Sequence, residues 1–317
     1  MQASSQLLLS VPGKLMIAGE YAVLRPAGVC LAVAVGRLVE VYATEGAPGV
    51  WLEAFGMRLD GNAASTGLGQ FASAAARAAE QAWGIRAQGS LLLQVHGSQD
   101  GKKVGLGTSA AVTVATLRGL AALAGHGATA DEVARLARSV HRQVQGAGSG
   151  YDVTTIAHGG CVAFDRHGDT TQALDWPQGL VMAAFFTGQA APTAPALARV
   201  VAMGETLQAI DAAARELLAL WPVAAPKTLM AALDHCEKAL DVAAARVPDL
   251  LPPALQATRQ FCREHGLVAR TSGAGGGDCV LGCGPPAAVA AAVRSWRAGG
   301  RLVVAELPAD LAPCREQ

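Results

Sequence analysis

Apolar residues recur along the chain in two patterns, and each pattern predicts a different kind of element. Apolar runs bounded by turn residues predict strands at 6–11, 29–43, 50–54, 91–96, 161–164, 180–187, 267–271, 278–283 and 301–306. Apolar residues at helical spacing predict helices at 68–82, 108–124, 130–144, 196–220, 226–246, 252–265 and 286–298. Because strands and helices follow one another in irregular order with no internal repeat, we expect an α+β fold.

A change in pattern near the middle of the chain predicts a domain boundary. The segment 187–195 is rich in Pro, Thr and Ala and predicts a loop, and helical patterns prevail after it. We place the boundary between residues 165 and 190, and we divide the chain into domains of residues 1–170 and 171–317.

Composition and charge exclude several classes of protein. Of the 317 residues 51% are hydrophobic, and Lys+Arg and Asp+Glu both number 25, so the chain supports a sizeable core and has no net charge. No long basic run is present and aromatic residues are only 4%, which argues against nucleic-acid binding. The uncharged stretch 176–198 is interrupted by prolines, and the N-terminus lacks a basic leader. We therefore expect a cytoplasmic protein that does not bind membranes.

The seven cysteines are scattered, which favours reduced thiols over a disulfide framework. Two pairs, His235 with Cys236 and Cys262 with His265, have residue types that bind zinc. The alternative is that these cysteines are small core residues and the histidines lie on the surface, and this is the interpretation we favour.

Three glycine-containing segments carry the candidate chemistry: 12–23, 102–111 and 271–279. In the second segment Gly105 and Gly107 lead directly into a helical pattern that begins near Ser109. Unpaired N–H groups at a helix start, with glycines that allow close approach, form a binding site for phosphate. The hydroxyls of Thr108 and Ser109 offer further contacts to phosphate oxygens or Mg²⁺.

The same segment also fits GxGxxA, so a dinucleotide-binding turn is an alternative. That motif follows a strand directly, whereas here the polar residues 97–104 intervene. The chain contains neither GxxxxGK[ST] nor GxSxG, which excludes the usual P-loop and the nucleophile elbow.

Taken together, the three segments resemble the motifs of the GHMP small-molecule kinases, in the same order and at similar spacing. Within that superfamily the chain is most similar to the phosphomevalonate kinases. The resemblance rests on GKLMIAGEYAVL at 13–24, on Lys102-Lys103 before the second glycine segment, on GSGYDVTTIAHGG at 148–160 and on Asp278-Cys279. Mevalonate kinases tend to have His in place of Tyr21.

The resemblance implies a two-domain GHMP kinase fold, with an N-terminal domain like the second domain of ribosomal protein S5 and a ferredoxin-like C-terminal domain. It also implies transfer of the γ-phosphate of ATP to 5-phosphomevalonate in isoprenoid biosynthesis, with Mg²⁺. The protein would act on this small molecule as a monomer or homodimer.

Roles follow residue by residue from the same resemblance. Lys14 and Asp152 would be catalytic, and Ser109 would contact Mg²⁺. ATP would bind at Lys103, Gly105, Leu106, Gly107, Thr108, Ser109 and Ala110. The acceptor would bind at Lys14, Glu20, Tyr21, Arg142, Ser149, Arg270, Gly275 and Gly276. Glu20 and Tyr21 have a second interpretation, as a buried hydrogen-bonded pair. Arg142 and Arg270 are candidates because they lie close to the motifs in sequence.

The chain departs from the family pattern at one position that bears on the metal. Mevalonate kinases have a glutamate that binds Mg²⁺ eleven residues before the catalytic aspartate, and this position is His141 here. The alternatives that stay open are a mevalonate kinase, another GHMP kinase, and a catalytically silent nucleotide sensor of the same fold. A diphosphomevalonate decarboxylase is disfavoured because its distinctive N-terminal segment has no counterpart.

Overall fold

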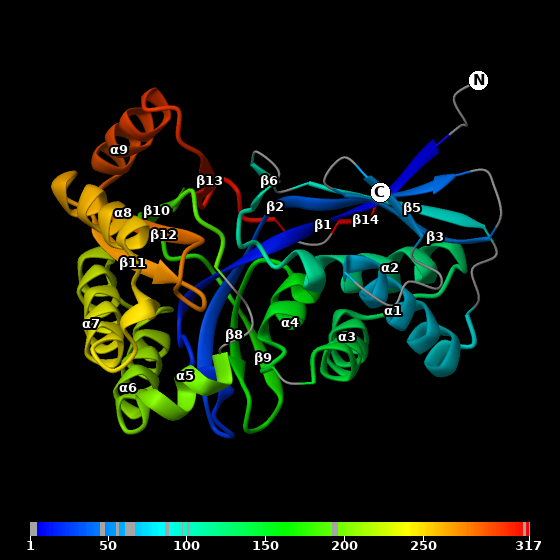
Figure 1. The fold of residues 1–317 in the computed structure, drawn as a ribbon, viewed down its shortest axis with the longest axis horizontal. Coiled ribbons are helices and arrows are strands. Elements are labelled where there is room, and N and C mark those ends of the chain that lie inside the picture. The colour runs from blue at the N-terminus through cyan, green and yellow to red at the C-terminus, as the bar shows by residue number, and fades with distance from the viewer. Residues whose placement is uncertain are drawn as a thin grey trace.

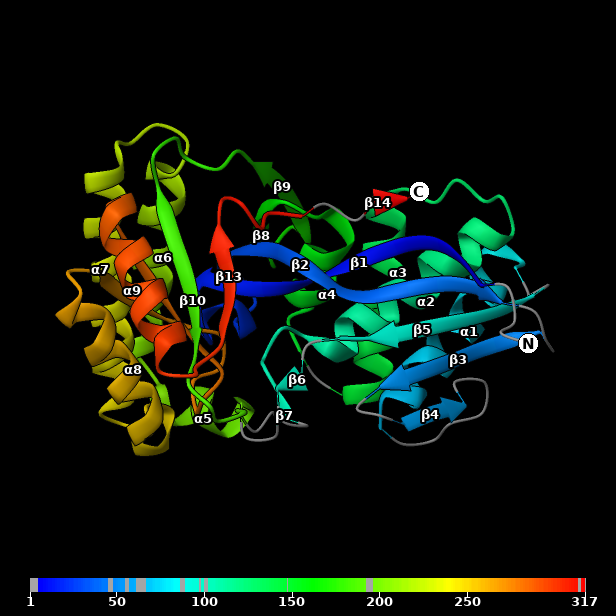
Figure 2. The ribbon, with the colours of Figure 1, turned by 90° about the horizontal axis from the view of Figure 1, so that it is seen from above.

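Two sheets lie side by side, each covered by helices, in the computed structural model of the protein (Figures 1 and 2). The structure describes residues 5–44, 48–54, 57–60, 67–85, 89–96, 98–99, 102–146, 148–191, 196–312 and 315–316. Cys314 and part of the predicted loop 187–195 lie outside these residues. No helix in these ranges is both long and apolar enough to cross a membrane.

The first sheet is built around the long antiparallel pair β1 (Ser5–Ala18) and β2 (Val29–Thr44). Its strand order is β14-β1-β2-β5-β3-β4, with β8 and β9 extending from β2. The remaining strands are β3 (Gly49–Ala54), β4 (Met57–Asp60), β5 (Ser90–Val95), β8 (Cys161–Asp165), β9 (Thr170–Leu174) and β14 (Arg315–Glu316).

Four helices cover one face of this sheet: α1 (Gly67–Trp83), α2 (Thr108–Leu123), α3 (Ala130–Gln145) and α4 (Tyr151–His158) (Figure 1). The residues of α2 are buried on almost every side, as expected for a uniformly apolar helix between a sheet and other helices. A Cβ at Gly119 would lie 2.8 Å from Val41 Cγ1, so only glycine lets α2 pack this closely on β2. A short ribbon of β6 (Ser98–Gln99) and β7 (Lys102–Lys103) precedes α2.

The second sheet has the order β11-β12-β10-β13 and is wholly antiparallel. Its strands are β10 (Val181–Phe186), β11 (Val268–Ser272), β12 (Cys279–Gly284) and β13 (Val303–Leu307). The strand β10 is apolar at every position because both of its faces are covered. Met182 and Phe186 face a core that contains α6 and α7, whereas Phe185 faces a core formed with α8 and α9.

The helices of this half are α5 (Ala196–Met203), α6 (Thr206–Leu220), α7 (Pro226–Ala244), α8 (Pro253–Glu264) and α9 (Pro286–Ala298). Two 3₁₀ turns, η1 (Ala22–Leu24) and η2 (Pro248–Leu250), complete the elements that position the site.

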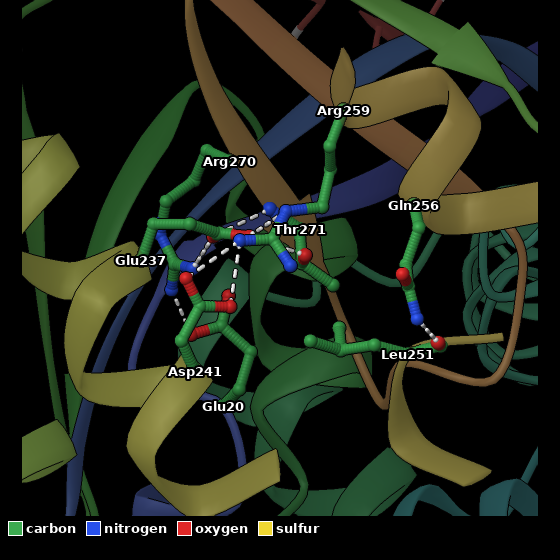
Figure 3. Close-up of polar contacts among 8 residues, drawn as sticks. All are labelled: Glu20, Glu237, Asp241, Leu251, Gln256, Arg259, Arg270 and Thr271. Carbon is green, nitrogen blue, oxygen red and sulfur yellow. Dashed lines mark hydrogen bonds and ion pairs between the residues drawn. The ribbon is translucent and has the colours of Figure 1, made fainter. Parts of the chain in front are cut away.

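A buried ion-pair network joins the two halves (Figure 3). The guanidinium of Arg270, on β11, lies between the carboxylates of Glu20 and Glu237, and all three side chains are at most 2% exposed. Glu237 also binds Arg259 Nε at 2.9 Å and accepts a hydrogen bond of 2.7 Å from the hydroxyl of Thr271. Burial raises the pKa of Glu20 to about 7 although Arg270 opposes that rise. Arg270 is thus the internal counter-ion of two carboxylates from distant parts of the chain.

The structure corrects several predicted elements. β1 continues through Pro12 to Ala18 because a register shift between Val11 and Gly13 accommodates the proline. The helix predicted at 196–220 is divided into α5 and α6 at Gly204, which has a positive φ of 54°. Strand β9 pairs with β8 in the first sheet, so this sheet includes residues on both sides of the division expected at residue 170. The short elements β4, β6, β7, β9 and β14 were not predicted.

We expect Arg270→Met to lower the free energy of unfolding by about 3–5 kcal/mol, because it leaves the buried carboxylate of Glu20 without its counter-ion and that of Glu237 with Arg259 alone. The measurement is chemical denaturation followed by circular dichroism. Arg297→Met is the control, since the pair Arg297–Glu306 is exposed by 56% and 40%, and its loss should cost less than about 1 kcal/mol. Equal, small effects of the two substitutions would contradict the role given to the network.

Candidate active site

A cavity of about 300 Å³ brings all three glycine segments together. The first segment contributes β1 and the turn after it, the second contributes the start of α2, and the third contributes the loop between β11 and β12. Helix α3 and the start of α4 complete the wall.

The start of α2 has the features of a phosphate-binding site. Gly107 is the N-cap, in the left-handed conformation, and the first helical hydrogen bond runs from Ala111 N–H to Gly107 O at 2.9 Å. The N–H groups of the first turn therefore precede the helical bonds, and the hydroxyl-bearing residues Thr108 and Ser109 line the cavity. The predicted contact residues Leu106 and Ala110 differ from these. Neither of them lines the cavity. The backbone oxygen of Leu106 accepts a hydrogen bond of 2.9 Å from the backbone N–H of Lys14, and Ala110 is fully buried.

Gly105 allows the second and third segments to meet. Its φ is +76°, and a Cβ there would lie 2.3 Å from Asp278 Cγ. Asp278 itself has a positive φ of 59°, and its Oδ1 accepts a hydrogen bond from Ala191 N–H at 3.0 Å. Burial raises the pKa of Asp278, against the opposing effects of that hydrogen bond and of Lys14. Sequence reasoning noted this aspartate but assigned it no contact.

Lys14 lies within β1, beyond residue 11, at which the predicted strand ends. Its Nζ donates a hydrogen bond of 3.2 Å to Gly105 O and lies 5.7 Å from the centre of the Tyr151 ring. Burial tends to lower the pKa of this ammonium group. Its interactions with Tyr151, Asp278 and Asp152 outweigh the burial and raise that pKa, so the group is charged at neutral pH.

Asp152 lies in the first turn of α4, close to Lys14 and to α3. The N-cap of α4 is Gly150, so Asp152 is not the capping residue. Its Oδ1 accepts a hydrogen bond from Val153 N–H at 2.9 Å, and its Oδ2 lies 4.0 Å from His141 Nδ1. The side chain is 25% exposed and lines the cavity, which leaves it accessible to a bound molecule.

One face of α3 lines the cavity at the spacing i, i+3, i+4 and i+7, with Arg138, His141, Arg142 and Gln145. Sequence reasoning identified Arg142 as a contact and missed Arg138, although the helical spacing from Arg142 contained the signal. Arg138 donates to Thr154 Oγ1 at 3.0 Å and to Asp169 Oδ2 at 2.8 Å. Arg142 is exposed at the cavity wall.

Four further residues that line the cavity are Glu20, Tyr21, Ser149 and Ala274. Ser149 Oγ accepts a hydrogen bond from Tyr151 N–H at 3.4 Å. Glu20 lines the cavity and is also the buried partner of Arg270, as described above, and Tyr21 donates its hydroxyl hydrogen to Ala274 O. The hydrogen bonds and the ion pair described for Glu20 and Tyr21 thus join each of them to other residues and not to one another, and their contact with an acceptor stays a prediction.

Three predicted acceptor contacts do not face the cavity. Arg270 is 1% exposed and fully engaged by two carboxylates, so its prediction as a ligand of the acceptor phosphate is wrong. Gly275 and Gly276 turn toward η2: a Cβ at Gly275 would lie 2.6 Å from Leu250 O, and Gly276 N–H donates to the same oxygen at 2.7 Å. Gly273 and Ala274 line the cavity in their place.

The cavity suits Mg²⁺ that is held mainly by phosphate oxygens. Ser109 and Asp152 offer oxygen donors on its wall, and Mg²⁺ commonly takes one or two protein oxygens together with substrate phosphates and water. His141, at the position of the family's glutamate, is a poor ligand for a hard cation. Within the described residues, no group of three or more His, Cys, Asp or Glu is arranged to hold a metal.

The zinc site and the dinucleotide-binding turn, the two alternatives considered from the sequence, lack support in the described residues. Cys236 and Cys262 are buried in separate cores, and His235 pairs with Glu216 at 2.9 Å on the surface. The strand before the glycine turn, β7, pairs with β6 in a separate antiparallel ribbon, whereas a dinucleotide-binding turn belongs to a βαβ unit.

Comparison with known proteins relates both halves of the chain to kinases. The model for the GHMP kinases N terminal domain matches residues 70–160, and that for GHMP kinases C terminal matches residues 229–302. Phosphomevalonate kinase of Streptomyces sp. (strain CL190) is 28% identical over 330 residues, covering 84% of this chain and 87% of that protein. Mevalonate kinase of Thermococcus sibiricus (strain DSM 12597 / MM 739) is 28% identical over 335 residues, covering 95% of this chain and 96% of that protein.

A solved structure shares the same fold over almost its whole length. Streptococcus pneumoniae phosphomevalonate kinase in complex with phosphomevalonate and AMPPNP superposes with a TM-score of 0.79. The match covers 96% of this chain and 99% of that one at 19% identity, and the TM-score shows that the two chains share a fold.

We expect Gly105→Ala to lower stability and to weaken ATP binding at least tenfold, because the new methyl group would displace Asp278 from the start of α2. Gly125→Ala is the matched control: Gly125 also has a positive φ, +63°, but has open space around it. Both substitutions carry a backbone cost of about 1–2 kcal/mol, whereas overlap adds about 1–3 kcal/mol at Gly105 alone. Calorimetric titration with ATP and thermal unfolding measure the difference. Similar results for the two variants would contradict the close approach at Gly105.

Proposed function

The chain belongs to the GHMP kinase family, and on this basis we propose that its cavity transfers the γ-phosphate of ATP to the phosphate of 5-phosphomevalonate. The product would be 5-diphosphomevalonate, a step of the mevalonate pathway. The observation that carries the proposal is the group of cationic side chains around the phosphate-binding start of α2: Lys14, Lys103, Arg138 and Arg142.

Charge is the main requirement of this reaction. A phosphomonoester acceptor brings nearly two negative charges next to the triphosphate of ATP. Their repulsion must be offset by cations placed before the reaction begins. Two cations that line the cavity support the proposal: Lys14, which is hydrogen-bonded to Gly105 O, and Arg142 on α3.

The proposed transfer forms one bond and breaks one. An oxygen of the acceptor phosphate bonds to the γ-phosphorus as the bond from that phosphorus to the β–γ bridging oxygen breaks, and ADP leaves with the electron pair. Lys14 would stabilise the charge on the transferring group, since its ammonium is already hydrogen-bonded at Gly105 O. Mg²⁺, held at Ser109 with the triphosphate, would supply further positive charge.

Asp152 would orient the acceptor and Lys14 rather than remove a proton. A phosphate monoester loses its second proton near pH 6, so the acceptor is largely ionised at neutral pH. The carboxylate lies on the first turn of α4 and lines the cavity, within 4.0 Å of His141 Nδ1. General-base catalysis by Asp152 becomes necessary only if the acceptor is a hydroxyl.

Mevalonate is the second candidate acceptor. The match to the Thermococcus sibiricus mevalonate kinase covers more of the chain than the match to the Streptomyces phosphomevalonate kinase, at equal identity. A coupled assay of ADP release with mevalonate, 5-phosphomevalonate, homoserine and galactose distinguishes these acceptors.

We expect Asp152→Asn and Lys14→Met each to lower kcat by roughly 10²–10⁴-fold, the usual scale for a positioned catalytic group. Both residues line the cavity, so melting temperatures should change little and the KM for ATP should change less than kcat. Lys227→Met, at an exposed lysine on α7, is the control. Near wild-type turnover by either cavity variant would exclude a catalytic role for that residue.

We expect 5-phosphomevalonate to be preferred over mevalonate by at least about 10³-fold in kcat/KM, because mevalonate would leave cations of the cavity without a phosphate partner. The preference should weaken as salt concentration rises. Arg142→Ala should impair use of phosphomevalonate far more than ATP binding. Arg135→Ala is its matched control, since Arg135 is an exposed arginine on the same helix and does not line the cavity. Equal turnover of the two acceptors would overturn the choice of acceptor and leave the family membership intact.

A further inference from the structure

Arg199 connects three segments next to the part of the cavity that Tyr21 and Ala274 line, which we call the acceptor wall, although Arg199 does not line the cavity itself. It lies on α5, and its side chain is 5% exposed. Its Nη1 donates to the Tyr21 hydroxyl at 3.0 Å and to Ala274 O at 3.1 Å, and its Nη2 donates to Asp249 Oδ2 at 2.8 Å. Both partners of Nη1, Tyr21 and Ala274, line the cavity.

Tyr21 needs such support because its backbone is strained. Its φ of 59° and ψ of −37° are unusual for a residue with a bulky side chain. Conformations of this kind cost about 1–3 kcal/mol and persist only where the surrounding structure holds them. The Tyr21 hydroxyl is held from two sides, since it donates to Ala274 O and accepts from Arg199.

The charge of Arg199 is also less compensated than that of Arg270, the buried arginine of the ion-pair network. Arg270 is enclosed by two buried carboxylates, whereas the partner of Arg199, Asp249, is 69% exposed. Water screens an exposed carboxylate strongly. The positive charge of Arg199 is therefore only partly neutralised, and it lies next to Tyr21 and Ala274.

We propose that Arg199 is a positioning residue that sets the acceptor wall by fixing Tyr21 and Ala274, and that it favours an anionic acceptor. This inference deepens the proposed function and rests on it. The substrate class is the anionic acceptor common to both candidates, which carry a carboxylate or a carboxylate and a phosphate. Arg199 takes no part in the transfer itself.

The test compares Arg199→Met and Arg199→Lys with Arg246→Met. Arg246 is the matched control, because its Nη1 donates to Met203 O at 3.4 Å and so also anchors α5, but it does not reach the cavity. Steady-state kinetics are measured with the acceptor varied at saturating ATP and then with ATP varied.

We expect Arg199→Met to raise the KM for the acceptor at least roughly tenfold, the scale of one lost hydrogen bond to a charged group. The KM for ATP should stay within about twofold, and Arg199→Lys should recover part of the loss because it restores the charge. Arg246→Met should leave kcat and both KM values unchanged. An unchanged acceptor KM in Arg199→Met, or parallel changes in kcat and both KM values, would overturn the inference.

A double-mutant cycle tests the route through Tyr21. We expect the effect of Arg199→Met on the acceptor KM to shrink at least roughly threefold when Tyr21→Phe is already present, because the two side chains share one bond. A fully independent effect would overturn the positioning role. If Arg199→Met does not fold, Arg199→Lys is used in the same cycle.

Failure of the inference and failure of the proposed function give different results. Wild-type protein that uses mevalonate but not 5-phosphomevalonate overturns the proposed acceptor, and the Arg199 variants are then judged on mevalonate. Wild-type protein that uses 5-phosphomevalonate, with Arg199→Met unchanged in acceptor KM, overturns the inference alone.

Discussion

The guanidinium of Arg270 holds the two halves of the molecule in the arrangement on which the cavity depends. It binds Glu20, in the turn that follows β1, and Glu237, on α7, from its own place on β11. These contacts fix the first glycine segment against the third. A buried ion pair of this kind contributes little net stability compared with apolar packing. The loss of one of its partners is nevertheless strongly destabilising, because it leaves a buried charge unpaired. The network therefore specifies how the two sheets meet more than it strengthens them.

Close contacts between backbone and side chains then bring the second glycine segment, residues 102–111, to the same cavity. Gly105 lies against Asp278, and Gly107 lies where a Cβ would be 3.1 Å from Lys14 Cγ. Lys14 in turn is hydrogen-bonded to Gly105 O. A residue with a side chain at either glycine would separate the ammonium group from the start of α2. The glycines therefore set the distance between the catalytic cation of the proposed mechanism and the phosphate-binding turn.

Much of this arrangement could be predicted from sequence because the motif residues are local signals. Lys14, Ser109 and Asp152 all line one cavity, as expected for residues that belong to glycine-containing turns. The assignment of Arg270 failed because its partners Glu20 and Glu237 are separated from it by 250 and 33 residues. Nothing local distinguishes an arginine that faces a ligand from one that faces buried carboxylates.

The face of a helix that meets the cavity is likewise a tertiary property. The amphipathic pattern of α3 predicted the helix, which begins with a capping box at Thr129 and Glu132, but not that Arg138 would line the cavity with Arg142. The position of Gly119 has a related consequence. It lies about 16 Å along α2 from Thr108, where a missing methyl group lets the helix rest on β2. A side chain at this remote glycine would push α2 away from β2, and the disturbance would reach the cavity although Gly119 does not line it.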